Sequence, residues 1–233
     1  MRKLWLWGAA AGVLCVSGAG QASGFFYKPQ VNLSVYGSYM EQDDHDAGLS
    51  PDGGGGGVQL GLSLTPHFFI GGMYQYDYLS QSNAPASAFG LGGGEISYGE
   101  KTNQARAGGG LKFHVPASPV DVFGKLEYVH FDYQTVHATV DGGALGNSDR
   151  VNDDGIGVHA GAQANLPGLS VYGSVGYLHL SQSEGPEFNV GLQVPMAPFM
   201  WGFVEYRYDD FRYIGYSDDN ESNNVKAGLR LTF

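Results

Sequence analysis

Apolar and polar residues alternate along much of this chain with a period of two. The stretch VKAGLRLTF at 225–233 places Leu229, Leu231 and Phe233 on one face, with Lys226 and Arg230 on the other. One apolar and one polar face at this period are typical of a half-buried β-strand. Chain ends usually fray into polar residues, so an aromatic residue on the apolar face of the last strand predicts that this strand is structural.

A repeat with the same register runs through four further segments. A glycine is followed at every second position by apolar residues, aromatic residues or a histidine, whereas the positions between them are mixed and partly charged. The repeats are Gly72, Tyr74, Tyr76 and Tyr78; Gly124, Leu126, Tyr128 and His130; Gly173, Val175, Tyr177 and His179; and Gly202, Val204, Tyr206 and Tyr208. This self-similarity predicts strands that share one apolar face with an aromatic edge. The residues of this predicted aromatic girdle are Tyr76, Tyr78, Tyr128, Tyr177, Tyr206 and Tyr208.

The connections between the strands indicate which way the apolar face points. In a soluble sandwich this face would form the core, whereas in a transmembrane barrel it would contact lipid, with the aromatic residues at the interface. Short proline-bearing turns are predicted at 65–67, 117–119, 167–168 and 195–198, and long polar loops at 41–52, 80–101, 134–153, 181–187 and 209–223. Short turns at one end and long loops at the other are typical of an outer-membrane barrel.

The turns also set the number of strands. Four short turns, with a seam where the first and last strands meet, require five hairpins and therefore ten antiparallel strands in an all-β, up-and-down barrel. The predicted strands are 31–40, 55–65, 68–79, 103–115, 120–133, 154–166, 169–180, 188–195, 199–208 and 224–233. An eight-stranded barrel is the alternative if 188–194 only folds over the others. Open sheet edges would leave unpaired backbone groups in hydrocarbon, so the last strand is expected to pair with the first.

Composition fits this all-β interpretation, and the start of the chain predicts export. The chain has 38 Gly, 15 Tyr and 13 Phe, a composition that favours strands over helices. A basic start, an apolar run and a small-residue stretch predict a signal peptide over 1–22, followed by one barrel domain over 23–233. The single cysteine, Cys15, lies in the signal peptide, so no thiol chemistry is expected in the processed chain.

The alternating last strand with its C-terminal aromatic residue resembles the assembly signal of bacterial outer-membrane β-barrel proteins, here Leu229, Leu231 and Phe233. With the signal peptide and the hairpin pattern, the whole processed chain resembles the family of small Gram-negative outer-membrane β-barrel proteins. The resemblance implies an outer-membrane location, recognition by the barrel-insertion machinery, and contact with outer-membrane lipid and lipopolysaccharide. It implies no catalytic residues and no cofactor, and we expect a monomer.

Charged residues are sorted between the loops and the strands. The five predicted long loops hold 17 of the 23 acidic residues, so the surface end is expected to be anionic. Most basic residues fall instead at inward-facing strand positions, which fits a barrel because charges facing lipid would be costly. With a net charge of -11, nucleic acid is not an expected partner. The expected lumen charge network is Asp77, Arg106, Lys112, Lys125, Glu127, Glu205, Arg207, Lys226 and Arg230.

Two interpretations of this lumen are open. Barrels near eight strands are just wide enough for side chains to fill, so we expect the charges to pair and plug the bore. The protein would then have a structural or surface-interaction role through its acidic loops. The same charges could instead line a narrow passive pore for small solutes or ions. Small inward residues favour the pore: Gly157, Gly161, Gly176 and Gly191.

Two inward histidines, His114 and His159, are expected to be hydrogen-bonded lumen residues.

Enzymatic alternatives rest on few residues. His179 and Ser181 are similar to the His-x-Ser pair of outer-membrane lipid A deacylases, in which they would act as base and nucleophile. No carboxylate is clearly placed to orient His179, because Glu184 and Glu187 fall in a predicted loop. An omptin-like protease would need acidic and histidine residues that face each other across the rim. The residues available for it are Asp43, Asp44, His45, Asp209 and Asp210. Because acidic rims arise without catalysis, we expect no enzyme.

A metal hypothesis concerns the acidic segments at 147–155 and 217–222. They offer oxygen ligands of the kind that calcium uses, but neither has the ligand spacing of a calcium-binding loop. No dedicated metal site is therefore expected. The alternative is that these loops share divalent cations with the phosphates of neighbouring lipopolysaccharide.

Overall fold

A computed structural model describes residues 30–44, 48–85, 95–140, 143–144, 150–214 and 219–233. The predicted signal peptide, His45, residues 147–149 of one acidic segment and residues 217–218 of the other lie outside these residues. Within the described ranges we find no helix with the length and apolar character that a membrane crossing requires.

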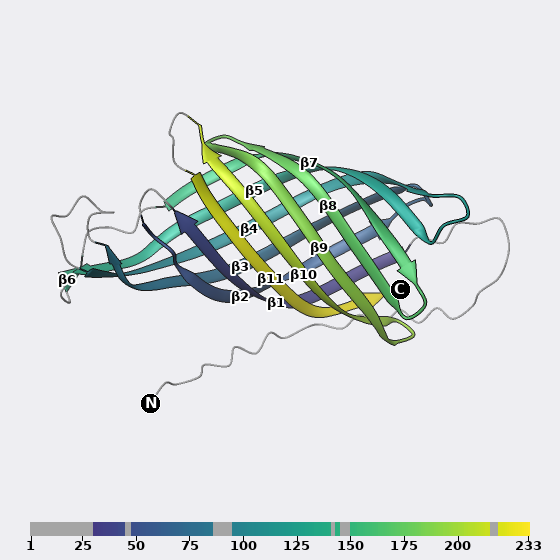
Figure 1. The fold of residues 1–233 in the computed structure, drawn as a ribbon, viewed down its shortest axis with the longest axis horizontal. Helices are drawn as coiled ribbons and strands as arrows, with labels where there is room; N and C mark the ends of the chain where they lie inside the picture. The colour runs from purple at the N-terminus through teal and green to yellow at the C-terminus, as the bar shows by residue number, and fades with distance from the viewer. Residues whose placement is uncertain (1–29, 45–47, 86–94, 141–142, 145–149, 215–218) are drawn as a thin grey trace.

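Ten long antiparallel strands form a closed barrel, and Figure 1 shows them tilted around its axis. They are β1 (Gln30–Asp44), β2 (Asp52–Ser63), β3 (Phe68–Pro85), β4 (Glu95–His114), β5 (Val120–Val140), β7 (Arg150–Leu166), β8 (Leu169–Leu180), β9 (Ser183–Ala197), β10 (Met200–Tyr213) and β11 (Asp219–Thr232). A two-residue strand, β6 (Gly143–Ala144), extends the end of β5. Each strand pairs with the next, and β11 pairs with β1 from Asn32↔Thr232 to Asp44↔Asn220. The prediction of a ten-stranded barrel closed by the last strand is confirmed.

The eight-stranded alternative is wrong because β9 is a full member of the sheet. It pairs with β8 from Ser170↔Gln193 to His179↔Glu184 and with β10 along almost its whole length. The strand is longer than predicted and begins at Ser183.

The long polar loops predicted from the sequence are much shorter in the structure. The segment 80–101, predicted as a loop, is mostly strand, since β3 continues to Pro85 and β4 begins at Glu95. The segments 134–153, 181–187 and 209–223 are likewise taken up largely by β5, β7, β9, β10 and β11. The prediction ended each strand where apolar alternation ended. Beyond the bilayer, however, an antiparallel ladder continues to satisfy backbone groups whatever the side chains are.

The apolar face of the sheet points outward and the charged face points into the lumen. Leu126, Val158 and Val175 are each more than half exposed on the outer surface, whereas Arg106 and Glu127 on the inner surface are only 6 % exposed. This distribution is the reverse of that in a soluble domain, and it suits a barrel surrounded by hydrocarbon. The six predicted girdle tyrosines lie on the outer face, where Tyr78 and Tyr208 are half-buried and the other four are exposed.

Tight turns join the strands at the end of the barrel where the C-terminus lies (Figure 1). In the two-residue turn between β7 and β8, Leu166 pairs with Leu169 and Gly168 takes a φ of 76°. A residue with a side chain is strained in this left-handed conformation, so the turn requires glycine. The hydrogen bonds between the backbones of Val31 and Phe233 lie at this same end.

Candidate functional site

The lumen contains an apolar layer toward the end opposite the short turns. Inward-facing residues from β5, β8 and β10 form it: Val129, Phe131, Leu178, Leu180 and Phe211, with Tyr133 packed against them. The Phe131 ring stacks on Tyr133 at a centroid distance of 5.6 Å and meets Phe211 edge-on at 5.8 Å. The five core side chains are 0–7 % exposed, so they fill the bore at this level.

A layer of buried charges lies next to the apolar layer. Arg106 of β4 is the central residue, with its Nη1 3.0 Å from Glu127 Oε1 and its Nη2 2.6 Å from Glu187 Oε2. His159 of β7 places Nε2 2.9 Å from Glu127 Oε1 and Nδ1 3.6 Å from Glu187 Oε1. The guanidinium of Arg106 also lies 5.9 Å from the centre of the Phe131 ring, which joins the two layers. These ion pairs connect β4 to β5 and, across the lumen, to β9.

Four inward-facing glycines leave room in the lumen for large side chains of neighbouring strands. A Cβ on Gly176 would lie 2.1 Å from His159 Nδ1, and one on Gly157 would lie 2.5 Å from Leu178 Cδ2. A Cβ on Gly161 would lie 2.5 Å from the Phe123 ring, and one on Gly191 would lie 2.3 Å from the Tyr172 ring. The four small residues that favoured a pore in the sequence therefore accommodate large side chains from neighbouring strands and do not widen the bore.

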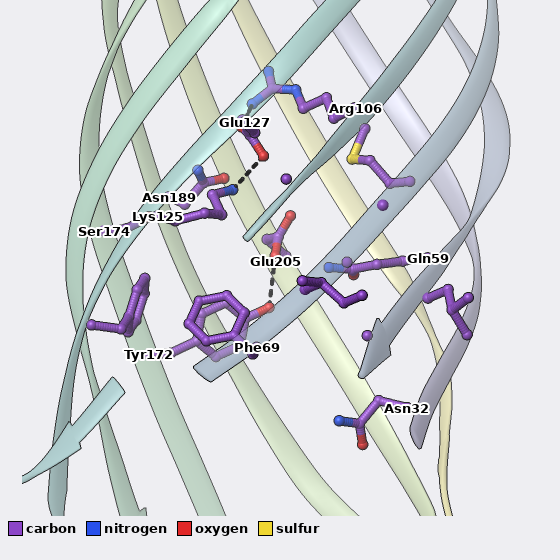
Figure 2. Close-up of a pocket in the computed structure, with 18 of the residues that line it drawn as sticks. Asn32, Gln59, Phe69, Arg106, Lys125, Glu127, Tyr172, Ser174, Asn189 and Glu205 are labelled. Carbon is purple, nitrogen blue, oxygen red and sulfur yellow. Dashed lines mark hydrogen bonds and ion pairs between the residues drawn. The ribbon is translucent and has the colours of Figure 1, made fainter. Parts of the chain in front are cut away.

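A cavity of about 320 Å³ with both polar and apolar lining residues lies on the other side of the charge layer, toward the short turns. Figure 2 shows Lys125 paired with Glu127 and Tyr172 paired with Glu205 inside it. Lys125 Nζ lies 2.7 Å from Glu127 Oε2, and the Tyr172 hydroxyl donates to Glu205 Oε2 at 2.7 Å. Lys226 Nζ donates to the second oxygen of Glu205 at 3.1 Å. The cavity is therefore bounded at this end by the buried ion pairs, and the apolar layer lies beyond them.

The structure brings most of the predicted lumen charges together and separates a few. Arg106, Lys125 and Glu127 form one group, and Glu205 pairs with Lys226. Asp77 lies apart from both groups. Its carboxylate accepts hydrogen bonds from the Ser38 hydroxyl at 2.5 Å and the Gln75 amide at 2.7 Å. Arg207 pairs with Asp209, Arg230 bonds to neutral partners, and Lys112 lines the cavity.

The sequence analysis places Glu127 in the lumen but not two other acidic residues of the buried charges, Glu187 and Asp209. Glu187 was placed in a loop, and Asp209 at the start of another, but both are strand residues that are 1 % exposed. The signal that identifies Glu187 is the strand alternation itself. Phe188 and Val190 face outward, so continuing the period of two by one more residue places Glu187 in the lumen.

Of the two histidines expected in the lumen, only His159 is buried. It is 3 % exposed within the charge layer, whereas the side chain of His114 is 63 % exposed at the short-turn end, with Nδ1 2.9 Å from Asp121 Oδ1.

Glu127, His159 and Glu187 have donor atoms within 4.8 Å of one another, as a metal site would require. However, Arg106 already forms ion pairs with both carboxylates, so its guanidinium occupies the position of a cation. This cluster therefore fits an ion-pair network better than a metal centre.

The residues of the deacylase hypothesis do not meet. His179 Nδ1 lies 2.9 Å from Glu184 Oε2, so a carboxylate does contact this histidine, contrary to the expectation from the sequence. Ser181, however, donates its hydroxyl to Asp153 Oδ1 at 2.8 Å, and Asp153 also accepts from Ser183 at 2.6 Å. The serine is thus held by a carboxylate on the lumen side and is not paired with the histidine.

The omptin hypothesis finds little geometric support among the described residues. Asp209 points into the lumen and lies 3.1 Å from Arg207 Nε, while Asp210 is on the opposite face of β10. Asp43 accepts a hydrogen bond from Ser50 at 3.1 Å near the end of β1. These aspartates therefore do not converge on a common site across the rim.

An ion pair between an exposed arginine and a buried aspartate lies beyond the girdle, outside the membrane-spanning part of the barrel. Asp132 is two residues past His130 on β5, and Arg150 donates to its two oxygens from Nε at 2.7 Å and Nη2 at 2.6 Å. This bidentate contact lowers the pKa of the Asp132 carboxyl below its ordinary value.

Comparison with known proteins identifies the family. The model described as outer membrane protein beta-barrel domain matches residues 8–192. Ail of Yersinia pestis is a similar solved structure, with 12% sequence identity, coverage of 88% of this chain and 100% of that chain, and a TM-score of 0.44. Neisserial surface protein A has 12% identity, coverage of 87% of this chain and 97% of that chain, and a TM-score of 0.43. The protease OmpT of Escherichia coli has 10% identity, coverage of 88% of this chain and 96% of that chain, and a TM-score of 0.46. The search of curated proteins gives no match. The family model covers most of the chain. This chain therefore belongs to the outer membrane protein β-barrel domain family and is located in the outer membrane.

Proposed function

We propose that this protein is a non-conducting, non-enzymatic barrel that presents an acidic rim at the cell surface, with a role in envelope integrity or surface contact. The observation that carries the proposal is the pair of stacked layers across the lumen. Arg106, Glu127 and Glu187 are each at most 6 % exposed, and the apolar side chains beyond them are 0–7 % exposed. A continuous water path would have to pass through both layers.

The energy needed to open such a path supports the closed state. Separating Arg106 from its two carboxylates would leave charges without partners in a medium of low polarity. Breaking a buried ion pair in this way typically costs about 3–5 kcal/mol. Opening would also require displacement of Phe131 and Phe211, which pack against each other in the layer above.

Conductance of the purified, refolded protein in a planar lipid bilayer tests the closed state. We expect no stepwise current, with a known porin in the same membrane as the positive control. Regular single-channel steps would overturn the proposal in favour of the second candidate, a narrow passive pore for small solutes or ions. The cavity of about 320 Å³ is the observation that favours this second candidate.

The surface role requires a test of its own. In a strain that lacks the gene, we would complement with the wild type or with a variant in which Glu41→Gln, Asp52→Asn, Glu184→Gln and Asp210→Asn neutralise the rim. We expect sensitivity to detergents and antibiotics in the rim variant, because these carboxylates are the contacts available for divalent cations or basic partners. The control is Asp121→Asn, which removes one acidic group at the opposite end. Full complementation by the rim variant would contradict a role for these acids.

The absence of enzymatic activity is supported by the hydrogen bond from Ser181 to Asp153, because a nucleophilic serine needs its base as partner. We expect the acylation pattern of lipid A, measured by mass spectrometry, to be the same with wild type and with Ser181→Ala. Loss of acyl release in this variant would identify a deacylase.

A further inference from the structure

The cavity near the short turns has an excess of positive charge, although the chain as a whole has a net charge of -11. Three acidic side chains, Glu127, Glu187 and Glu205, are among the described residues that line it. The basic ones number six: Arg106, Lys112, Lys125, Arg207, Lys226 and Arg230. Asp209 lies outside the lining and neutralises Arg207, which leaves an excess of two positive charges. A low-dielectric wall that carries one sign of charge concentrates ligands of the opposite sign.

Two of the basic residues account for this excess. Arg230 donates to the Ser34 hydroxyl at 3.0 Å and to Gln193 Oε1 at 2.8 Å, and its guanidinium lies 5.4 Å from the centre of the Phe203 ring. All three partners are neutral. In the part of the chain that the structure describes, Lys112 has no acidic partner either. Both cations thus retain a full charge that an anion could neutralise.

The two cations reach the cavity from different walls of the barrel. Lys112 is on β4 and Arg230 on β11, and β1, β2 and β3 separate these strands on the shorter way around. Aromatic side chains also line this cavity, and Figure 2 labels two of them, Phe69 and Tyr172. Phe123 is a further lining residue. The lining therefore combines unneutralised positive charge with apolar ring surface.

We infer that this cavity binds a small organic anion, a carboxylate attached to an apolar ring, taken up from the end of the barrel that carries the short turns. The carboxylate is neutralised by Arg230 and Lys112, and the ring packs against Phe69 and Phe123. A volume of about 320 Å³ is at the lower end of the range for small-molecule sites. Because the charge layer closes the cavity toward the surface, the ligand is bound and not transported.

Benzoate and benzamide are suitable probes because they have the same shape and differ in charge. We would titrate each into the refolded full chain in detergent micelles by isothermal titration calorimetry. We expect benzoate to bind and benzamide to bind about tenfold or more weakly, since the charge-assisted hydrogen bonds to the carboxylate are lost. Arg230→Gln and Lys112→Gln should each weaken benzoate binding about tenfold, because each removes one of these charged contacts. Lys101→Gln, on the outer face at the opposite end, is the matched control and should leave benzoate binding unchanged.

Heat-modifiable mobility on a gel verifies that each variant is folded. If Arg230→Gln does not fold, Lys112→Gln decides the result, because the lysine side chain has no hydrogen bond or ion pair to lose among the described residues. Equal binding of benzoate and benzamide would overturn the inference. So would unchanged benzoate binding in Lys112→Gln, or no benzoate binding at millimolar concentrations. Conductance is measured separately, so failure of this binding test leaves the closed-barrel proposal standing.

Discussion

Replacement of Arg106 by Gln tests whether the buried ion pairs hold the barrel together. Arg106 lies 3.0 Å from Glu127 and 2.6 Å from Glu187, and its side chain is 4 % exposed. Gln keeps part of the side-chain length but removes the charge, so two carboxylates lose their main partner in a medium of low polarity. Loss of one partner from a buried pair typically costs about 3–5 kcal/mol. We expect the lower part of this range, because Lys125 still pairs with Glu127.

Urea unfolding in lipid vesicles, followed by the fluorescence of Trp201, measures this loss of stability. Arg150→Gln is the matched control, because it removes the same charge from an ion pair in which the arginine is 63 % exposed. Solvent screens the exposed guanidinium of Arg150, although Asp132 itself is only 9 % exposed, so we expect a smaller loss of stability than in Arg106→Gln. Equal destabilisation by the two substitutions would refute the argument, and so would a change below about 1 kcal/mol in Arg106→Gln.

Three further predictions follow from the same structure. Gly176→Ala should destabilise the barrel by about 1–3 kcal/mol, because the added Cβ would lie 2.1 Å from His159 Nδ1. Gly173→Ala should be nearly neutral in the same urea titration, because the nearest atom to its added Cβ would be 3.4 Å away. Arg150 lowers the pKa of Asp132 below 3.8, so this ion pair stabilises the fold above that pH, and its contribution is lost as the pH falls through the lowered pKa. The difference in unfolding free energy between wild type and Asp132→Asn should therefore shrink under acid. A constant difference from pH 7 to pH 2 would contradict this prediction. Val190→Lys on the lipid face should lower the free energy of unfolding by about 2–4 kcal/mol. Asn189→Lys should lower it less, because this position faces the lumen beside Glu187. The reverse order would mean that the two faces are assigned wrongly.

The fold could be predicted from the sequence because its main determinant is local. A period of two with apolar residues on one face fixes which side chains of a strand face lipid, as Leu126 and Tyr128 illustrate. The short turns and the requirement that a membrane sheet close then set the strand number. The extent of the strands beyond the bilayer could not be read in this way, because the ladder continues there without an apolar pattern.

The ion pairs of the lumen depend on distances between strands that are not neighbours. Alternation places Arg106 and Glu127 in the lumen, but nothing in it indicates that Arg106 of β4 reaches Glu187 of β9. That contact depends on the width of the barrel and on the tilt of both strands. Similarly, Gly176 appears in the sequence as a small residue that could open a channel. Its actual role becomes visible only when the ring of His159, from the neighbouring strand, is seen to occupy the space.

The cross-lumen contacts link strands of the barrel that are not neighbours. Backbone hydrogen bonds of a ladder join only adjacent strands, so they resist separation of neighbours but not flattening of the ring. Arg106 is long enough to reach Glu187 on a distant strand, and its planar guanidinium forms ion pairs with two carboxylates at once. The apolar layer above it excludes water and thereby strengthens these ion pairs. The cavity of about 320 Å³ lies on the other side of the layer, where the charges of Lys112 and Arg230 are not paired with carboxylates among the described residues. The asymmetry of the lumen therefore follows from the same residues that close it.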